Sequence, residues 1–476
     1  MTFTTVEFAI LVAVTFIIYY LVPDKFRWMV LLAAGGYFYY QTGIGSFVFL
    51  LVTIAVSYVC ALLIERTGSK WYLMLITVVL FVGMLCVMRM PFAGFIMPMG
   101  LSFYALGCLG YCIEVYRKST PAQKNPAKYA LYISFFPHVL QGPFEDYNEM
   151  KAEFEKPHPF DYDMAVYGMY RIVFGVLKKL VIADRISYIV DKIYASPDSY
   201  YGMTLVLCMF LYSLQLYADF SGYMDIAVGC AKLFGINIRE NFNVPYASKS
   251  MAEFWRRWHM SLGLWFKSYV FYPVQRTRLC TGIRKYMKAR KNRYGMTVIP
   301  SVIGLVCVWT LIGLWHGFDW NYLVYDWTCG LIIIISELLR NVYDRLGNAL
   351  GKVYKSRLAD MLRVVRTFIL VSFTFVLFRP DTLGDSFTFL RRMFMRPGMK
   401  DMAEFVYWNI YDLFLILVPV IVLVIVDTMK YKGINVCEKL HRLNPVVRYI
   451  IYGVGLVYIY VAQGDREQVA FAYSIF

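Results

Sequence analysis

Apolar runs of bilayer-spanning length recur along the whole chain, among them residues 6–22, 46–64, 71–88, 92–113 and 411–426. Inside a bilayer only helices and closed barrels satisfy every backbone polar group, and a spanning helix takes about 20 residues. Hydrophobic residues make up 59% of the 476 residues, whereas soluble domains hold about 45–50%. We therefore predict an all-α integral membrane protein with roughly 11–13 transmembrane or re-entrant helices.

The chain contains no long polar stretch that could form a separate soluble domain. We predict one polytopic membrane domain over residues 1–476, with N-terminal helices in 1–113, a core in 114–345 and C-terminal helices in 346–476. In the core, charges and Pro or Gly separate short apolar pieces such as 130–140, 164–183, 203–220 and 226–236. Irregular backbone at membrane depth survives only where protein or water covers it, so this section is expected to hold broken and re-entrant helices.

Basic residues mark the same side of the membrane after successive apolar runs. Lys25 and Arg27, then Arg66 and Lys70, then four cations in 117–128, follow alternate segments, and residues 276–293 hold eight Lys or Arg and no acid. Loops rich in Lys and Arg stay in the cytoplasm, which predicts an N-terminus outside the cell. The same bias accounts for the net charge of +16, so we expect no nucleic-acid partner. The start lacks a basic region, so the first segment is expected to be a retained helix and not a cleaved signal.

The ten cysteines lie mostly inside apolar segments and form no CxxC pair. They are expected to be small buried hydrophobic residues, and no ligand cluster predicts a metal. The chain also has no GxSxG, P-loop or HEXXH motif. Any chemistry must therefore depend on other polar residues at membrane depth.

His316 is the first candidate for chemistry. It lies in the turn "GLWHGFDWN", residues 313–321, between two apolar segments at 296–315 and 322–339. An ionisable group at membrane depth is costly and is a functional candidate by default. Histidine can act as a general base on a hydroxyl, and Gly317 lets backbone or substrate approach closely. Asp319, three residues away, is the candidate to orient the imidazole. The alternative is a histidine that merely hydrogen-bonds a neighbouring helix.

The stretch "EFWRRWHMSLGLWF", residues 253–266, is the second candidate. Ser250 and Glu253 fit a capping box, so we predict a helix that begins near Ser250. On one continuous helix, Trp255 and His259 share an aromatic face with residues 262, 266 and 269, while Glu253 and Arg257 can pair. The alternative is an amphipathic helix at the membrane surface, which explains the tryptophans and arginines but not His259.

Two further stretches place ionisable groups in apolar surroundings. In "LQLYADFSGYMDIAVG", residues 214–229, Asp219 shares a helical face with Gln215 and Gly222, and Asp225 follows. A structural ion pair is the favoured interpretation of these carboxylates, and a wet cavity is the alternative. In "FFPHVLQGP", residues 135–143, His138 is expected to be a structural hydrogen-bonding residue and not a catalyst.

Several of these stretches resemble the membrane-bound O-acyltransferase family, in particular its bacterial polysaccharide branch. The matching segments cover nearly the whole chain: "PMGLSFYALGCLGYCIEVYR" (98–117), "YISFFPHVLQGPFEDYNEM" (132–150), "GVLKKLVIADR" (175–185), "QLYADFSGYMDIAVGCAKLFGINIRENFNVPY" (215–246), "SKSMAEFWRRWHMSLGLWFKSYVFYPV" (248–274), "GLWHG" (313–317), "FRPDTLGDSFTFLRRMF" (378–394) and the closing "FAYSIF". The resemblance implies a multi-helix fold that encloses a tunnel across the membrane. It also implies that His316 matches the family's near-invariant histidine and His259 its second, more variable one.

The resemblance further implies an acyltransferase of a bacterial plasma membrane. A cytoplasmic thioester, acetyl-CoA or an acyl-carrier protein, would give an acyl group, favoured to be acetyl, to a cell-surface polysaccharide. No cofactor would be bound permanently, and an extracytoplasmic transferase or esterase-like protein would be a partner. The alternatives are D-alanyl transfer to teichoic acid, less plausibly a lipid or sterol acyltransferase, and, outside enzymes, a transporter or assembly scaffold.

Within this interpretation the candidate residues take separate roles. Trp315, Trp320 or a backbone amide beside Gly317 would donate to the oxyanion, and His316 would deprotonate the acceptor. Trp255, Arg256, Arg257 and the basic residues 276–293 would attract an anionic donor. His259 is the second catalytic candidate, expected near the cytoplasmic face at the entrance for the donor, with the reactive end of the tunnel at His316.

Overall fold

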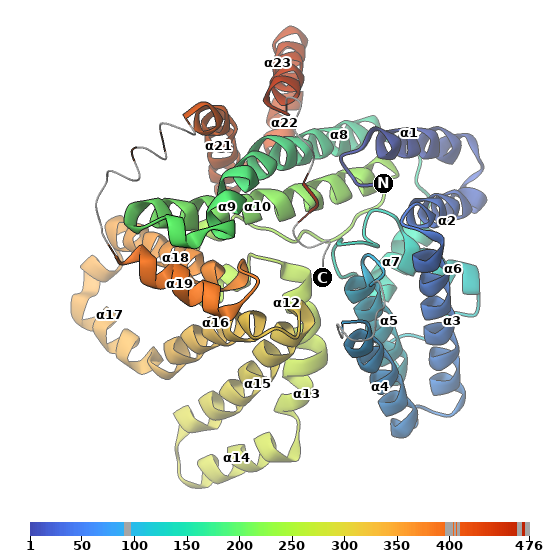
Figure 1. Cartoon of the computed structure of the whole chain (residues 1–476). Helices are drawn as coiled ribbons and strands as arrows, with labels where there is room; N and C mark the ends of the chain where they lie inside the picture. The colour runs from blue at the N-terminus through green and yellow to red at the C-terminus, as the bar shows by residue number, and fades with distance from the viewer. Residues whose placement is uncertain (90–96, 396–402, 404–405, 407–409, 464–468, 472–476) are drawn as a thin grey trace. The chain divides into compact units, whose positions relative to one another are not determined.

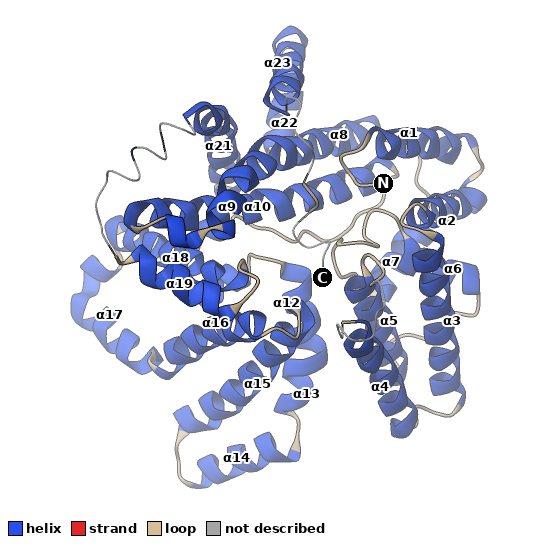
Figure 2. Ribbon diagram, viewed as in Figure 1, coloured by secondary structure: helices blue, strands red, loops and turns tan. Residues whose placement is uncertain are grey.

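The computed structural model describes residues 1–89, 97–395, 403, 406, 410–463 and 469–471. Helices joined by short loops make up this part of the chain, and it contains no strand (Figure 2). The start of the predicted 92–113 segment and the last five residues of "FAYSIF" fall outside the described residues.

Among the described residues, seven helices are long and apolar enough to cross a membrane. They are α3 (Ile44–Arg66), α4 (Trp71–Met88), α10 (Gly202–Leu233), α15 (Arg293–His316), α18 (Arg357–Phe378), α21 (Ile410–Tyr431) and α23 (Pro445–Gln463). An eighth candidate is the bent pair of α16 (Trp320–Leu338) and α17 (Arg340–Tyr354), while α1 (Val6–Leu21) and α5 (Leu101–Tyr116) are apolar but shorter. The predicted all-α integral membrane fold is confirmed.

The chain divides into two compact units that interleave in sequence. Unit 1 comprises residues 1–181, 218–240 and 437–476, and unit 2 comprises 182–217 and 241–436. One of their four boundaries along the chain falls inside α10, and neither unit coincides with the sections 1–113, 114–345 and 346–476.

Unit 1 holds α1 to α8, the C-terminal half of α10, and α23. Its helices not yet named are α2 (Asp24–Tyr40), α6 (Pro126–Ser134), α7 (Tyr147–Glu155), α8 (Tyr162–Val176) and α22 (Val436–His441). The π-helix η2 (Leu177–Ala183) continues α8 and crosses the unit boundary after residue 181. Two glycines on α8, Gly168 and Gly175, face Gly229 and Gly222 on α10. A Cβ at Gly175 would lie 2.5 Å from the carbonyl oxygen of Gly222, so small residues let these two backbones touch.

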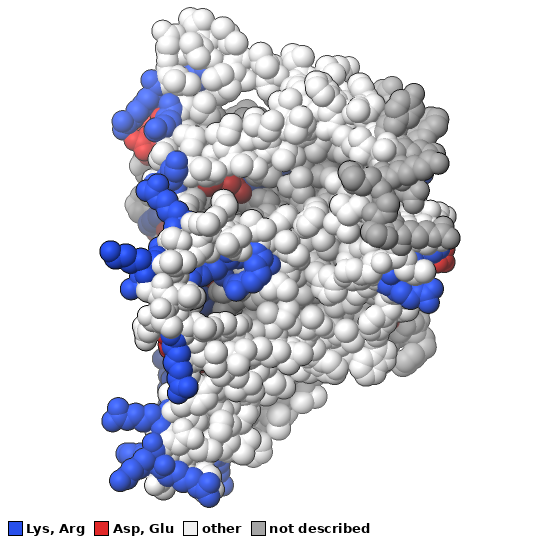
Figure 3. All heavy atoms as spheres, turned by 90° about the vertical axis from the view of Figure 1, so that its left-hand side faces the viewer, with Lys and Arg blue, Asp and Glu red and all other residues white. Residues whose placement is uncertain are grey.

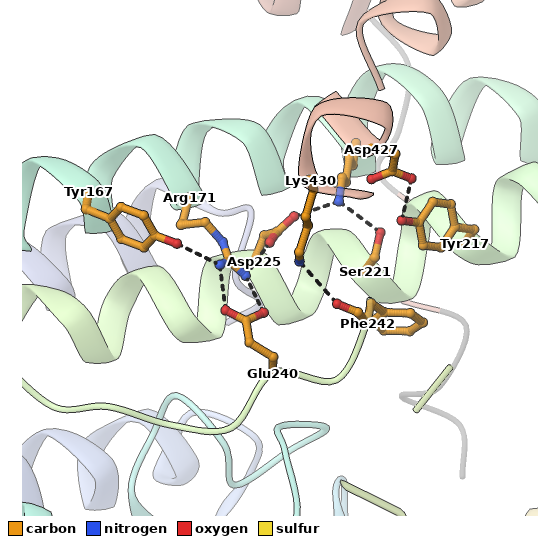
Figure 4. A network of polar contacts seen from close by, with 10 residues as sticks. Tyr167, Arg171, Tyr217, Ser221, Asp225, Glu240, Phe242, Asp427 and Lys430 are labelled. Atoms are coloured by element: carbon orange, nitrogen blue, oxygen red, sulfur yellow. Dashed lines mark hydrogen bonds and ion pairs between the residues drawn. The ribbon is translucent and has the colours of Figure 1, made fainter. Parts of the chain in front are cut away.

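Buried charges join the same two helices (Figure 4). Arg171 of α8 pairs with Asp225 of α10 at 2.6 Å and with Glu240 at 2.7 Å. Lys178 reaches the other oxygen of Asp225 at 2.7 Å and Ser221 at 3.1 Å. The prediction of separate apolar pieces at 203–220 and 226–236 is wrong. Because two cations neutralise Asp225, the acid between these pieces, α10 continues unbroken from Gly202 to Leu233.

Unit 2 is built around the antiparallel neighbours α15 and α16 (Figure 1). Gly330 of α16 lies against the ring of Trp309 of α15, and Gly313 lies against Leu323. Unit 2 also holds the N-terminal half of α10, α17, α18 and α21. Its elements not yet named are α9 (Asp184–Ala195), η3 (Pro197–Ser199), η4 (Pro245–Ala247), α11 (Met251–Trp255), α12 (Met260–Phe266), η5 (Lys267–Phe271), α13 (Tyr272–Gln275), α14 (Arg278–Ala289) and α19 (Leu383–Met393). Figure 3 looks at the side of unit 2 that carries α17 and shows Lys and Arg gathered along one edge.

Candidate functional site

His316 is the last residue of α15, and its side chain is buried. Gly317 follows it, and the Gly317 amide donates to the carbonyl of Gly313 as the final hydrogen bond of the helix. Helix α16 then begins at Trp320. The predicted turn between two apolar helices is therefore confirmed. The Gly317 amide itself already has a helical acceptor, which makes it a poor oxyanion donor.

The carboxylate that orients His316 is Asp326, on the second turn of α16. Its Oδ2 lies 2.8 Å from His316 Nδ1, and its side chain is fully buried. The prediction that Asp319 orients the imidazole is wrong, because Asp319 precedes the first residue of α16 and is exposed. An acid in an apolar helix is a sequence signal for a membrane-depth partner, and by that signal Asp326 could have been found.

Aromatic rings enclose the imidazole. The Phe378 ring meets it edge-on at 5.3 Å between centroids, and Tyr325 lies at 6.2 Å. Gly317 is required on steric grounds, since a Cβ there would lie 2.5 Å from the ring of Tyr322. The His316–Asp326 pair therefore sits in surroundings of low polarity, where their electrostatic interaction is strong.

His259 lies in a break between two helices and not on one continuous helix. Ser250 caps α11 as predicted, accepting from the Glu253 amide, but α11 ends at Trp255 and α12 starts at Met260. His259 has φ 47° and ψ 50°, the left-handed region that L side chains avoid. The predicted aromatic face is therefore wrong. The surface-helix alternative also fails, because Trp258 and Phe254 are buried.

Residues 241–243 hold this strained turn on both sides. Asn241 accepts the Ser261 amide with its side chain at 2.8 Å and the Met260 amide with its carbonyl at 3.0 Å. The Asn243 amide donates to the Arg257 carbonyl at 3.0 Å. Strain of this kind persists only where the surroundings over-determine it, and it is concentrated at functional sites. No pattern in the sequence indicated a role for Asn241.

The structure brings the two histidines into one cluster through Trp315. The Trp315 ring lies 6.2 Å from His259 and 5.1 Å from His316, and all three side chains are buried. The predicted separation of His259, at the donor entrance, from a deeper His316 is therefore wrong. The reversal of the chain at 256–259 folds His259 back toward the end of α15.

The predicted donor-side residues differ in their surroundings. Arg256 is exposed. Arg257 pairs with Glu253 at 2.9 Å, as predicted, and its guanidinium lies over the ring of Tyr431. Trp255 packs edge-on against Trp309 at 5.1 Å. Arg256 thus presents an exposed guanidinium, while Arg257 and Trp255 have structural partners within unit 2.

Asp219 forms an ion pair with Lys179 in unit 1, with Nζ and Oδ1 2.7 Å apart and both groups buried. Asp219 and Asp225 therefore form the ion pairs that the favoured interpretation predicted. Trp320, the alternative oxyanion donor, is 64% exposed. Within the described residues, no three His, Cys, Asp or Glu side chains are arranged to hold a metal ion.

Comparison with known proteins agrees with the sequence analysis. Residues 117–287, which include His259 but not His316, match the model of the membrane-bound O-acyltransferase family. The resemblance to that family is confirmed. The chain is 33% identical over 300 residues to a probable alginate O-acetylase, AlgI, of Azotobacter vinelandii, covering 63% of this chain and 54% of that protein.

Two relatives with other acceptors are also similar to this chain. One is a peptidoglycan O-acetyltransferase of Helicobacter pylori, 26% identical over 342 residues, with 65% of this chain and 60% of that protein covered. The other is a teichoic acid D-alanyltransferase of Bacillus subtilis, 32% identical over 254 residues, with coverage of 52% and 60%. The chain spans about half the length of the alginate relatives that it matches.

Proposed function

We propose that this chain is a membrane-embedded acyltransferase that passes an acyl group, an acetyl in our proposal, from a cytoplasmic thioester to a hydroxyl of a cell-surface polysaccharide. The observation that carries the proposal is the buried His316–Asp326 pair at 2.8 Å. The alginate and peptidoglycan relatives support acetyl as the group and a polysaccharide as the acceptor. D-alanyl transfer is the second candidate, because the teichoic acid D-alanyltransferase is 32% identical.

In the proposed reaction Asp326 keeps the proton of the imidazole on Nδ1, so Nε2 presents its lone pair. Nε2 takes the proton of the acceptor hydroxyl while the hydroxyl oxygen attacks the thioester carbonyl carbon. The tetrahedral intermediate collapses, the carbon–sulfur bond breaks, and the imidazolium returns the proton to the departing thiolate. Asp326 stabilises the imidazolium between these two transfers.

Trp315 and His259 are the proposed donors to the oxyanion of the intermediate. Both are buried beside His316, where an N–H dipole stabilises a developing charge more than it does in water. Gly317 would contribute to the site only because it has no side chain, which leaves room for the ring of Tyr322.

The ends of α15 support the direction of transfer. Arg293 begins the helix and adjoins the basic residues 276–293, while His316 ends it about 35 Å farther along. By the charge rule the basic end faces the cytoplasm, so in our proposal the N-terminus and the acceptor lie on the outer side. Donor attraction by Arg256 and a tunnel between the two faces belong to the same proposal, as does an extracytoplasmic partner protein.

The test is the variant His316→Ala, expressed in a strain that lacks the native copy. Surface polysaccharide is hydrolysed and its ester groups are identified by mass spectrometry. We expect the ester to disappear while the amount of protein in the membrane stays normal. An acetyl ester in the wild type supports the first candidate and a D-alanyl ester the second. Unchanged ester content in the variant would instead favour a transporter or assembly scaffold.

A further inference from the structure

A groove of about 370 Å³ opens on unit 1, far in sequence from the two histidines. It lies between the start of α2, the start of α6 and the helix α7, which gather in Figure 1. Three lysines line it, one from each helix: Lys25, Lys128 and Lys151. A hollow of this size is within the range of small-molecule sites.

The groove has more positive charges than carboxylates to pair with them. Lys128 pairs with Glu155 at 3.1 Å, and Asp24 pairs with Arg27 at 2.6 Å. Lys25 and Lys151 have no carboxylate partner among the described residues, although they line the same hollow. Two ammonium groups are therefore left to bind an anion, and lysine is a common partner of phosphate.

The remaining wall is aromatic and partly fixed. Trp28, Tyr147 and Phe154 line the groove. Tyr147 is held in place because its hydroxyl accepts from the side chain of Gln123 at 2.8 Å. Rings of this kind pack against a flat base or an acyl chain, so the ligand would join a charged group to an apolar or planar part.

We propose that this groove binds the phosphate group of an organic anion, with the ammonium groups of Lys25 and Lys151 on the phosphate and Trp28 against the rest of the ligand. The phosphate has two possible sources, the headgroup of an anionic phospholipid and a soluble nucleotide. The site lies wholly in unit 1, whereas His316 and His259 lie in unit 2. It does not depend on the proposed function.

The experiment uses the purified full-length chain in a neutral detergent. Binding is measured with phosphatidylglycerol against zwitterionic phosphatidylcholine, and with ATP against adenosine. The test variant is Lys25→Gln/Lys151→Gln. The control, Lys70→Gln/Lys118→Gln, removes the same charge from exposed lysines of unit 1 that do not line the groove.

We expect either phosphatidylglycerol or ATP to bind the wild type and the control equally, and to bind the test variant at least ten-fold more weakly. Loss confined to phosphatidylglycerol identifies a lipid headgroup, and loss confined to ATP identifies a nucleotide. Trp28→Leu should then weaken the same ligand several-fold. Absence of binding to the wild type, or equal binding by the test variant and the control, would overturn the proposal.

Discussion

His316 Nδ1 and Asp326 Oδ2 lie 2.8 Å apart in a buried, aromatic-lined site, joining the end of α15 to the second turn of α16. The hydrogen bond sets which imidazole nitrogen carries the proton, and the carboxylate offsets the charge of an imidazolium. Neither effect requires Asp326 to touch a substrate. Asp326 is therefore a positioning residue, and its contribution can be separated from that of His316.

Asp326→Asn should lower ester formation by a factor on the order of 10² to 10⁴, because the amide can stabilise the wrong tautomer and carries no charge. The control is Asp319→Asn, which alters an exposed acid three residues from His316 and should stay within about two-fold of the wild type. The assay is the ester content of surface polysaccharide, normalised to protein in the membrane. A wild-type rate for a well-expressed Asp326→Asn variant would remove the carboxylate from the mechanism.

At His259 a glycine should stabilise the chain more than an alanine does, which is the reverse of the order at an ordinary helical position. Its left-handed backbone makes His259→Gly more stable than His259→Ala, by about 1 kcal/mol in the free energy of unfolding. Both variants should have lower activity than the wild type, because both lack the imidazole beside Trp315.

Thermal unfolding of the purified variants measures the difference. Lys285, exposed within α14, is the matched control, and there alanine should be the more stable residue. If alanine is more stable than glycine at both positions, the turn at His259 is not strained. Wild-type activity in both His259 variants would exclude His259 from the site.

Local sequence patterns predicted the ends of helices well where the residues that set those ends lie within the same segment. Residues 71–88 were predicted as a span and form α4 with the same bounds. The turn at 313–321 was predicted from its glycines and polar residues, and α15 and α16 end and begin inside it. In both cases apolar length and breaking residues lie next to each other in the sequence.

The wrong predictions concern features that depend on contacts between residues far apart in the sequence. The acids of α10 were interpreted as breaks because the cations that neutralise them, Lys178 and Lys179, precede them by 47 and 40 residues. The left-handed turn at His259 depends on Asn241, 18 residues earlier along the chain. The pattern of a single segment contains no information on either contact. It therefore predicted a break within α10, which is continuous, and a continuous helix at His259, where the chain turns.

The stability of the chain should depend on pH through Glu145, which lies in the loop before α7. Burial raises the pKa of Glu145 from 4.5 to about 7, although Arg239 beside it acts in the opposite sense. The folded state therefore binds this proton more tightly than the unfolded state does. The resulting stabilisation is complete below pH 4.5 and is lost as the pH rises through 7, by up to about 3 kcal/mol.

Glu145→Gln should remove this contribution. We expect the free energy of unfolding of the wild type, minus that of Glu145→Gln, to fall between pH 4.5 and pH 7.5. Taking the difference cancels every other group that titrates in the range. A difference that does not change with pH would show that Glu145 ionises in the folded chain as it does in water.

Variants of the Lys179–Asp219 ion pair test whether Asp219 has a structural or a chemical role. Removal of one partner leaves a buried charge, so Asp219→Leu and Lys179→Met should each lower the free energy of unfolding by about 3–5 kcal/mol. The double variant removes both charges and should regain most of that stability, since apolar residues of similar volume often replace a buried ion pair without loss. Lys179 also lies 4.4 Å from the ring centroid of Phe471, a contact that methionine can keep as a packing interaction.

If Asp219 serves only to pair with Lys179, the double variant should transfer acyl groups at close to the wild-type rate. A double variant that is folded but inactive would show instead that the carboxylate takes part in the chemistry.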